Sequence, residues 1–176
     1  MKCVALVPIK TTNRRLPGKN TRCFTNGEPL CRYILKTLCG TKYLDGIYVY
    51  SSDESLISYL PEGVTFLKRP ESLDKDTTSM NEILKCFIDS VDSDVYLLTH
   101  ATAPFITKES LEKGISAVIS GDYDSSFSVE KCQNFYWKNG EPFNYDPENI
   151  PRTQDLEPLY EETCGFYCFR KEVIAG

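Results

Sequence analysis

The chain has 176 residues, which suits one domain with a substantial core, and a formal net charge of −5. Residues 1–42 hold nine Lys and Arg against one acid, Glu28, whereas the remaining 134 residues hold 11 basic and 24 acidic groups. This asymmetry favours a local anionic ligand near the N-terminus over a nucleic-acid surface, because nucleic-acid binders are usually basic overall or along a whole face.

Composition also argues against a membrane or secreted protein. No apolar run approaches the roughly 20 residues that span a bilayer, and the first residues lack the small-residue cleavage site of a signal peptide. Eight scattered cysteines without a CxxC pair fit reduced thiols and give no zinc-ligand spacing. We therefore expect a cytoplasmic protein with no membrane or nucleic-acid partner.

Strand and helix patterns alternate along the chain. Asp53, Ser79 and Thr107 are predicted helix caps, with Ser79 and Glu82 forming a capping box. In chain order, the predicted elements are a strand at 3–9, a helix at 29–39, a strand at 46–52, a short helix at 53–60, a strand at 64–70, a helix at 77–91, a strand at 94–99, a helix from 107 through 119, a strand at 125–129, a hairpin around Asn139-Gly140, a strand at 165–169 and a helix from Lys171.

Strands separated by helices indicate βαβ units. The predicted fold class is therefore α/β, a three-layer αβα, Rossmann-like arrangement with a mostly parallel sheet, and a small β-hairpin excursion near 134–145. Residues 1–176 are predicted to form a single domain. Trp137, Tyr160 and Tyr167 are expected in the core. Ligands of such sheets bind at the carboxyl ends of the strands, so the loops after the first, second and fourth strands are the candidate site.

The loop after the first strand, "KTTNRRLPGKN", has the composition of a phosphate site. Lys10, Arg14 and Lys19 can converge on one anion because Pro17-Gly18 turns the chain back, and residues 11–13 (Thr-Thr-Asn) add small polar groups and backbone N–H donors. The loop is neither a GxxxxGK[ST] nor a GxGxxG cradle. A solvated basic loop is the alternative interpretation.

Five motifs in this order resemble one enzyme family over about 165 residues. They are the "RLPGKN" loop followed by "GEPL", then "VYSSDESLI", "LKRPESLDKDTTS", "YLLTHATAPFIT" and "PRTQDLEPLYEETCGFYCF". Together they are similar to the acylneuraminate cytidylyltransferases (CMP-sialic acid synthetases), to which the CMP-Kdo synthetases are related. The resemblance implies a fold of the nucleotide-diphospho-sugar transferase type. It also implies a reaction in which CTP and an acidic 2-keto sugar give a CMP-sugar and pyrophosphate.

The same resemblance implies roles for individual residues. Three basic side chains would act on the phosphates, with Lys19 nearest the α-phosphate: Lys10, Arg14 and Lys19. The nucleotide site would contain these three together with Thr11, Thr12, Asn13, Asn20, Arg69 and Asp76. The sugar would meet His100, Thr102, Arg152 and Gln154. The family also uses Mg²⁺, held in a C-terminal segment that this sequence does not include, and the full-length protein is expected to be a homodimer; no metal ligand is assigned.

Several alternatives stay open at this point. Arg69 and Asp76 also suit a salt bridge that holds the 68–76 loop to the sheet, and Arg152 suits a salt bridge within the acidic 155–162 stretch. His100 and Ile106 stand where the family has Gln and Arg, which puts the usual sugar in question. The chain is therefore expected to be a cytidylyltransferase for a sialic acid-like sugar. The alternatives are a non-catalytic nucleotide- or sugar-binding module, or a nucleotidyltransferase for a different sugar or alcohol.

Overall fold

The computed structural model describes residues 1–13 and 15–175, so the predicted phosphate ligand Arg14 lies outside the described residues. The chain divides into two compact units. The first unit comprises Met1–Ser128 and Cys164–Gly176, and the second comprises Val129–Thr163. Each unit is described by itself below.

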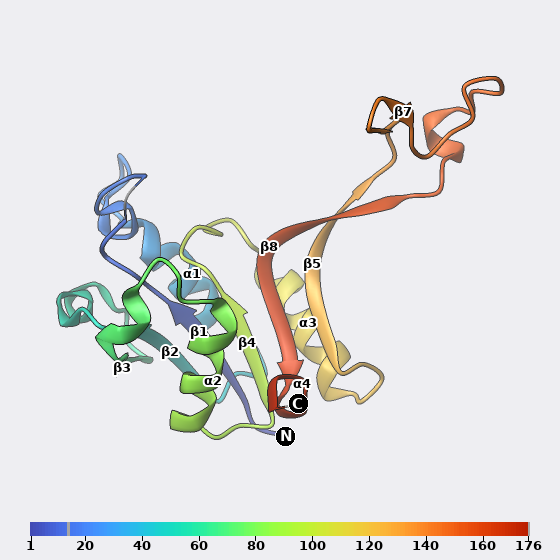
Figure 1. Ribbon diagram of the computed structural model, residues 1–176. Coiled ribbons are helices and arrows are strands. Elements are labelled where there is room, and N and C mark those ends of the chain that lie inside the picture. The colour runs from blue at the N-terminus through green and yellow to red at the C-terminus, as the bar shows by residue number, and fades with distance from the viewer. Residues whose placement is uncertain (14, 176) are drawn as a thin grey trace. The chain divides into compact units, whose positions relative to one another are not determined.

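The first unit is built on a six-stranded, mostly parallel sheet (Figure 1). Its strands, in spatial order, are β3 (Val64–Lys68), β2 (Gly46–Ser51), β1 (Cys3–Pro8), β4 (Val95–Thr99), β8 (Leu159–Arg170) and β5 (Ser125–Cys132). The first four are parallel, with Leu6 of β1 paired with Tyr48 of β2 and Leu98 of β4, whereas β8 runs antiparallel to β4. β5 and β8 continue into the second unit.

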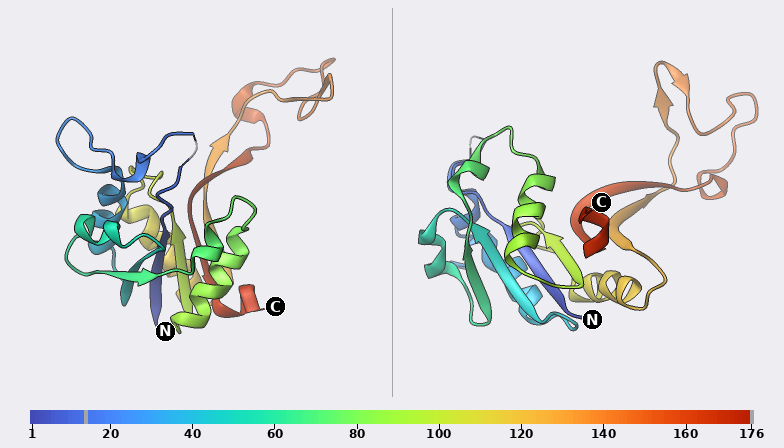
Figure 2. Two further views of the ribbon diagram at one scale, coloured as in Figure 1. Left: turned by 60° about the vertical axis from the view of Figure 1, so that its left-hand side comes forward. Right: turned by 60° about the horizontal axis from the view of Figure 1, so that its bottom comes forward.

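Helices cover both faces of this sheet, which confirms the predicted three-layer αβα arrangement (Figure 2). α1 (Leu30–Cys39) and α3 (Lys108–Ile119) pack on one face, and α2 (Met80–Ser90) packs on the other. The short α4 (Lys171–Ala175) joins α2 through Ile174.

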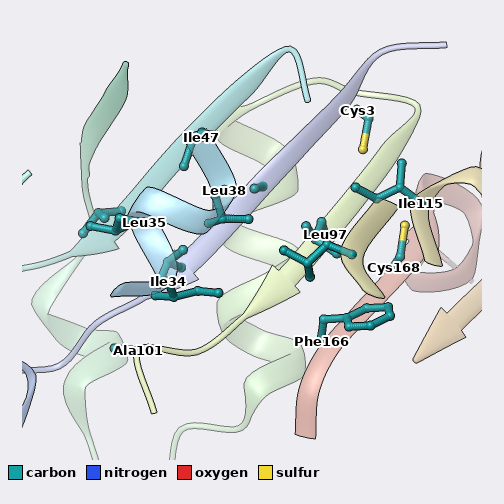
Figure 3. Packing of buried hydrophobic residues seen from close by; sticks show 14 of the residues in the cluster. Cys3, Ile34, Leu35, Leu38, Ile47, Leu97, Ala101, Ile115, Phe166 and Cys168 are labelled. Carbon is teal, nitrogen blue, oxygen red and sulfur yellow. The ribbon is translucent and has the colours of Figure 1, made fainter. Parts of the chain in front are cut away.

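The central strand β1 shows why both faces need cover. Its side chains alternate, so that Cys3, Ala5 and Val7 enter the cluster beneath α1 and α3, while Val4 and Leu6 enter the cluster beneath α2. Figure 3 shows the first of these clusters, in which Ile34, Leu35 and Leu38 of α1 face the sheet and Leu97, Ile115 and Phe166 pack further along it.

The predicted caps agree with the structure. Ser79 caps α2 in a complete capping box with Glu82, which is why this helix begins at Met80 and not at the predicted residue 77. Thr107 caps α3 by accepting a hydrogen bond from the Ser110 backbone N–H. Asp53 caps the predicted short helix, which is the 3₁₀ element η2 (Glu54–Tyr59).

The second unit contains the predicted hairpin, formed by β6 (Trp137–Lys138) and β7 (Glu141–Pro142). Asn139 and Gly140 both have positive φ, as a two-residue hairpin turn requires. The expectation that Trp137 and Tyr160 are core residues is wrong, because both side chains are largely exposed. Trp137 lies in a hairpin too small to have a second layer of its own. Tyr160 lies in the outer part of β8, where residues 160–164 are all exposed.

No helix in the described part of the chain has the length and apolar character that crossing a bilayer requires.

Candidate functional site

The loop that leaves β1 forms one wall of a cleft at the carboxyl edge of the sheet. The cleft has a volume of about 730 Å³ and is lined by Lys10, Thr11, Thr12, Asn13, Pro17, Asp74, Lys75, Asp76 and Thr77. It therefore combines the basic, hydroxyl-rich loop with the segment that follows β3. The cleft therefore lies where the sequence predicts a site, beyond the carboxyl ends of the parallel strands.

Buried hydrogen bonds fix the shape of the basic loop. The buried Asn20 side chain donates from Nδ2 to the Lys10 carbonyl oxygen at 2.9 Å, joining the two ends of the loop. Gly18 has a φ of 67°, which a glycine adopts without steric cost, and it precedes the 3₁₀ turn η1 (Lys19–Thr21). Asn20 thus orders the loop.

The loop is also tied to the end of β2. Hydrogen bonds from Ser55 and from the Thr11 side chain hold the pKa of Asp53 below its ordinary value. In contrast, the side-chain oxygen Oδ1 of Asn13 is buried without a hydrogen-bond partner. A buried polar atom left in this way is costly unless a ligand or water satisfies it, so Asn13 is suited to a polar ligand in the cleft.

The opposite wall is held by an ion pair at its base. The guanidinium of Arg69, only 2% exposed, pairs with Asp74, whose other carboxylate oxygen accepts a hydrogen bond from Ser52. Asp74 therefore ties the loop after β3 to the end of β2. Arg69 therefore forms a salt bridge that holds this loop to the sheet, which was the alternative interpretation of the residue, but its partner is Asp74 and not Asp76. The Arg69 guanidinium also lies 6.0 Å from the centre of the Tyr50 ring, and its Nε has no hydrogen-bond partner.

Asp76 instead faces the basic loop, where its carboxylate lies 3.0 Å from the Lys10 ammonium. The two side chains are 49% and 28% exposed, respectively. The predicted phosphate ligand Lys10 is thus paired with a protein carboxylate across the cleft.

A smaller hollow of about 280 Å³ adjoins this cleft and shares Lys10, Lys75 and Asp76 with it. It brings Arg69 and His100 to the same place as Lys10, so loops after β1, β3 and β4 meet there. Burial, with a contribution from the charge of Lys19, lowers the pKa of His100 below the ordinary value of 6.5. His100 is therefore neutral at pH 7 and can both donate and accept a hydrogen bond.

The remaining predicted site residues lie elsewhere. Lys19 lines a separate hollow of about 270 Å³ with Leu16 and Phe24, although its charge acts on His100. Thr102 is exposed, in the turn closed by the Ala103 N–H and the His100 carbonyl.

Arg152 and Gln154 belong to the second unit, around the 3₁₀ turn η4 (Thr153–Asp155). The Arg152 guanidinium makes two contacts with Asp155, of 2.7 and 3.1 Å, which is the salt bridge within the acidic stretch that was the alternative interpretation. Gln154 accepts a long hydrogen bond, 3.5 Å, from Gln133 through its backbone carbonyl.

The described residues do not fit a magnesium site. Within residues 1–13 and 15–175, no group of three or more His, Cys, Asp or Glu side chains is arranged to hold a metal ion. The two carboxylates that line the cleft, Asp74 and Asp76, are each in an ion pair. The Mg²⁺ predicted from the family resemblance therefore stays a prediction, and no reaction step is derived through it.

The sequence did not single out Asp74, Lys75 or Thr77 as site residues. All three residues belong to the motif "LKRPESLDKDTTS", whose resemblance to the family could have marked them as site residues. A motif does not show which of two neighbouring acids reaches Arg69 and which reaches Lys10. That assignment depends on the path of η3 (Glu71–Asp74) and the turn after it.

A mostly parallel α/β sheet with a cleft at its carboxyl edge, one wall of which is a basic, hydroxyl-rich loop, is suited to bind an anionic ligand such as a nucleotide. The family comparison makes the class specific: the model of the cytidylyltransferase family matches residues 4–175, and the chain belongs to that family.

Similar proteins include N-acylneuraminate cytidylyltransferase A of Danio rerio, 26% identical over 180 residues that cover 97% of this chain and 42% of that protein. Pseudaminic acid cytidylyltransferase of Campylobacter jejuni is 25% identical, over 95% of this chain and 78% of that protein. This chain thus spans less than half the length of the fish relative. Among solved structures, CMP:2-keto-3-deoxy-manno-octonic acid synthetase complexed with CTP has the same fold, with a TM-score of 0.70 and 16% identity over 99% of this chain and 76% of that chain.

Proposed function

We propose that this chain carries the nucleotide site of a cytidylyltransferase that uses CTP to activate an acidic 2-keto sugar, giving a CMP-sugar and pyrophosphate. The observation that carries the proposal is the cleft of about 730 Å³ in which Lys10 and residues 11–13 face a common space at the carboxyl edge. Family membership supplies cytidine as the nucleoside, and two relatives named for acidic sugars support the sugar class.

In this proposal the chain's own residues bind and orient the triphosphate. The Lys10 ammonium exchanges the Asp76 carboxylate for a phosphate oxygen, and the loop hydroxyls donate hydrogen bonds to further oxygens. The Asn13 Oδ1 atom is an acceptor, so it takes a hydrogen-bond donor of the nucleotide, such as an amino or hydroxyl group. The sugar hydroxyl attacks the α-phosphorus and gives its proton to solvent water as the new P–O bond forms, and the bond to the bridging oxygen breaks as pyrophosphate leaves with the electron pair. Positive groups that face the phosphates stabilise the charge that develops in this step.

Three further expectations belong to the same proposal. Turnover requires Mg²⁺, which would supply additional charge neutralisation of the triphosphate. The whole protein is a homodimer, and it resides in the cytoplasm. Loss of turnover on chelation, light scattering and cell fractionation test these statements separately.

Calorimetric titration with CTP, UTP and ATP, each with Mg²⁺, tests the proposal. CTP is expected to bind in preference to UTP and ATP, and Lys10→Ala is expected to weaken CTP binding more than tenfold. Lys36→Ala is the matched control, because Lys36 is also ion-paired, with Glu28, but lies on α1 outside the cleft. Pyrophosphate release would then be measured with N-acetylneuraminic, pseudaminic and 2-keto-3-deoxy-manno-octonic acids.

Equal binding of all three nucleotides, or unchanged affinity in Lys10→Ala, would refute the nucleotide assignment. Selective CTP binding without pyrophosphate release from any acidic sugar would instead favour the non-catalytic binding module.

A further inference from the structure

His100 is the single histidine of the chain, and it lies where loops that follow three parallel strands meet. It comes directly after β4 and lines the hollow of about 280 Å³ that also contains Lys10 and Arg69. It also lines an apolar cavity of about 440 Å³, whose walls include Met80 and Leu98. The imidazole therefore borders the charged hollow on the one hand and apolar side chains on the other.

The ring nitrogens of His100 are not used in a structural contact. Within residues 1–13 and 15–175, the side chain makes no hydrogen bond or ion pair, although the backbone carbonyl accepts a hydrogen bond from the Ala103 N–H. Burial and the charge of Lys19 lower the pKa of the ring, so it is neutral at pH 7. A neutral imidazole has one nitrogen whose lone pair accepts a proton. His100 thus offers a free proton acceptor to a molecule bound in the hollow.

The other titratable groups around the ring are poorer proton acceptors. They come from the loops after β1 and β3 and from β8, and are Lys10, Lys19, Arg69, Lys75, Asp76, Cys164, Tyr167 and Cys168. Ammonium and guanidinium groups have no lone pair to offer. Thiols and phenols are ordinarily protonated at neutral pH, and a carboxylate such as Asp76 is ordinarily a weak base that titrates near about pH 4.

We propose that His100 is the general base of the reaction: its free ring nitrogen accepts the proton of the attacking sugar hydroxyl as the new P–O bond forms, and then releases that proton to solvent water. The inference rests on the proposed function and adds the route of the proton. Because His100 and Lys10 line one hollow, a hydroxyl that attacks a phosphate held by Lys10 can lie within hydrogen-bond reach of the ring. The cations Lys10 and Lys19 then favour release of the proton from the imidazolium once pyrophosphate has left.

Single-turnover formation of CMP-sugar tests the proposal, with CTP and Mg²⁺ saturating and with the acidic sugar that supports pyrophosphate release. Because a protonated ring cannot accept the proton, the rate constant is expected to fall about tenfold for each pH unit below the pKa of His100. His100→Gln keeps the capacity for hydrogen bonds but not for a proton. It is expected to lower the rate constant at pH 7.5 by about a hundredfold and to abolish this dependence on acid, while CTP still binds.

The outcomes separate this inference from the proposed function. An acid limb that persists in His100→Gln, or an unchanged rate constant at pH 7.5, overturns the inference and leaves the cytidylyltransferase reaction intact. Failure of every acidic sugar to react with bound CTP refutes the proposed reaction, and this inference with it. Failure of CTP to bind refutes the nucleotide site itself.

Proton NMR measures the same group without turnover. Since the chain has a single histidine, the imidazole C–H resonances of the protein without an affinity tag belong to His100. Their titration in the CTP complex gives the pKa of the ring, which is expected to coincide with the pKa of the acid limb. Bound phosphates are expected to raise this pKa above that of the ligand-free chain. A kinetic pKa that differs from the ring pKa beyond experimental error overturns the inference.

Two further variants serve as matched controls. Asn81 lines the apolar cavity together with His100, and its amide forms hydrogen bonds but accepts no proton, so Asn81→Ala is expected to keep the acid limb. Asp76 loses its contact with Lys10 when a phosphate replaces it, so Asp76→Asn tests the carboxylate of the hollow as the base. This variant is also expected to keep the acid limb. Loss of the limb in Asp76→Asn and its retention in His100→Gln would assign the proton to Asp76 and contradict the inference.

Discussion

The ion pair between Lys10 and Asp76 spans the cleft in which the triphosphate is proposed to bind. A phosphate oxygen can take the Lys10 ammonium only by replacing the Asp76 carboxylate, which lies 3.0 Å away. We therefore predict that Asp76→Asn binds CTP more tightly than the wild-type chain. The substitution preserves the size of the side chain and removes the charge that competes with the phosphates.

The magnitude follows from the exposure of the pair. With the two side chains 28% and 49% exposed, the interaction is largely screened and contributes about 0.5–1 kcal/mol to the free energy of unfolding. Releasing Lys10 from Asp76 gains no more than that energy for the ligand, which corresponds to a Kd lower by up to about fivefold. Removing the repulsion between Asp76 and the phosphates adds to this gain at low ionic strength.

Calorimetry at 50 and 500 mM salt is the assay, with urea unfolding alongside it. Glu54→Gln is the control, because it breaks a surface pair of similar length, 2.9 Å to Lys68, outside the cleft. Tighter CTP binding in Asp76→Asn that fades at high salt supports the reasoning. Weaker binding would refute it, since Asp76 would then contribute a favourable contact to the bound nucleotide.

Three further predictions concern stability. Burial lowers the folded-state pKa of His100, so on acidification the unfolded chain binds a proton at this residue before the folded chain does. The free energy of unfolding should therefore fall as the pH drops below about 6.5. His100→Gln should reduce this loss, which melting curves at pH 7.5 and 5.5 would measure. Arg69→Ala should lower the free energy of unfolding by about 3 kcal/mol in urea titrations, because it leaves Asp74 without its cation, and a loss below about 1 kcal/mol would contradict this. Gly114→Ala should lower it by about 1–3 kcal/mol, since the added Cβ would lie 2.4 Å from the Phe166 ring, and an unchanged melting temperature would show that the ring moves freely.

The sequence was sufficient for the layers of the fold because local patterns determine them. Apolar periodicity separated strands from helices, and the capping side chains Ser79 and Thr107 marked where two helices begin. The same patterns underestimated β5 and β8, whose outer parts extend into the second unit with mostly exposed residues. A strand without a buried face leaves little periodic signal. Trp137 was expected in the core because its side chain is apolar, but it is exposed.

The candidate site was predictable only in part, since pairing between loops is not a local property. The basic loop and its position at the end of β1 follow from the sequence. Which acid pairs with which cation does not follow from the sequence. Asp74 and Asp76 are two residues apart, yet one meets Arg69 at the base of the wall and the other meets Lys10 across the cleft.

The ion pair between Lys10 and Asp76 joins the basic N-terminal part of the chain to its acidic remainder. Of the basic residues in 1–42, Lys10 is paired at the cleft with Asp76 from the loop after β3. A ligand with one negative charge gains little by replacing Asp76, because it exchanges one carboxylate contact for another of similar energy. A triphosphate gains more, since its further charges and oxygens also reach the hydroxyl and N–H groups of the loop. Releasing Lys10 from Asp76 costs the same energy whichever anion replaces the carboxylate, but the repulsion by Asp76 grows with the charge of the ligand. Asp76→Asn should therefore improve binding of CTP by a larger factor than binding of inorganic phosphate, a difference that the same calorimeter can measure.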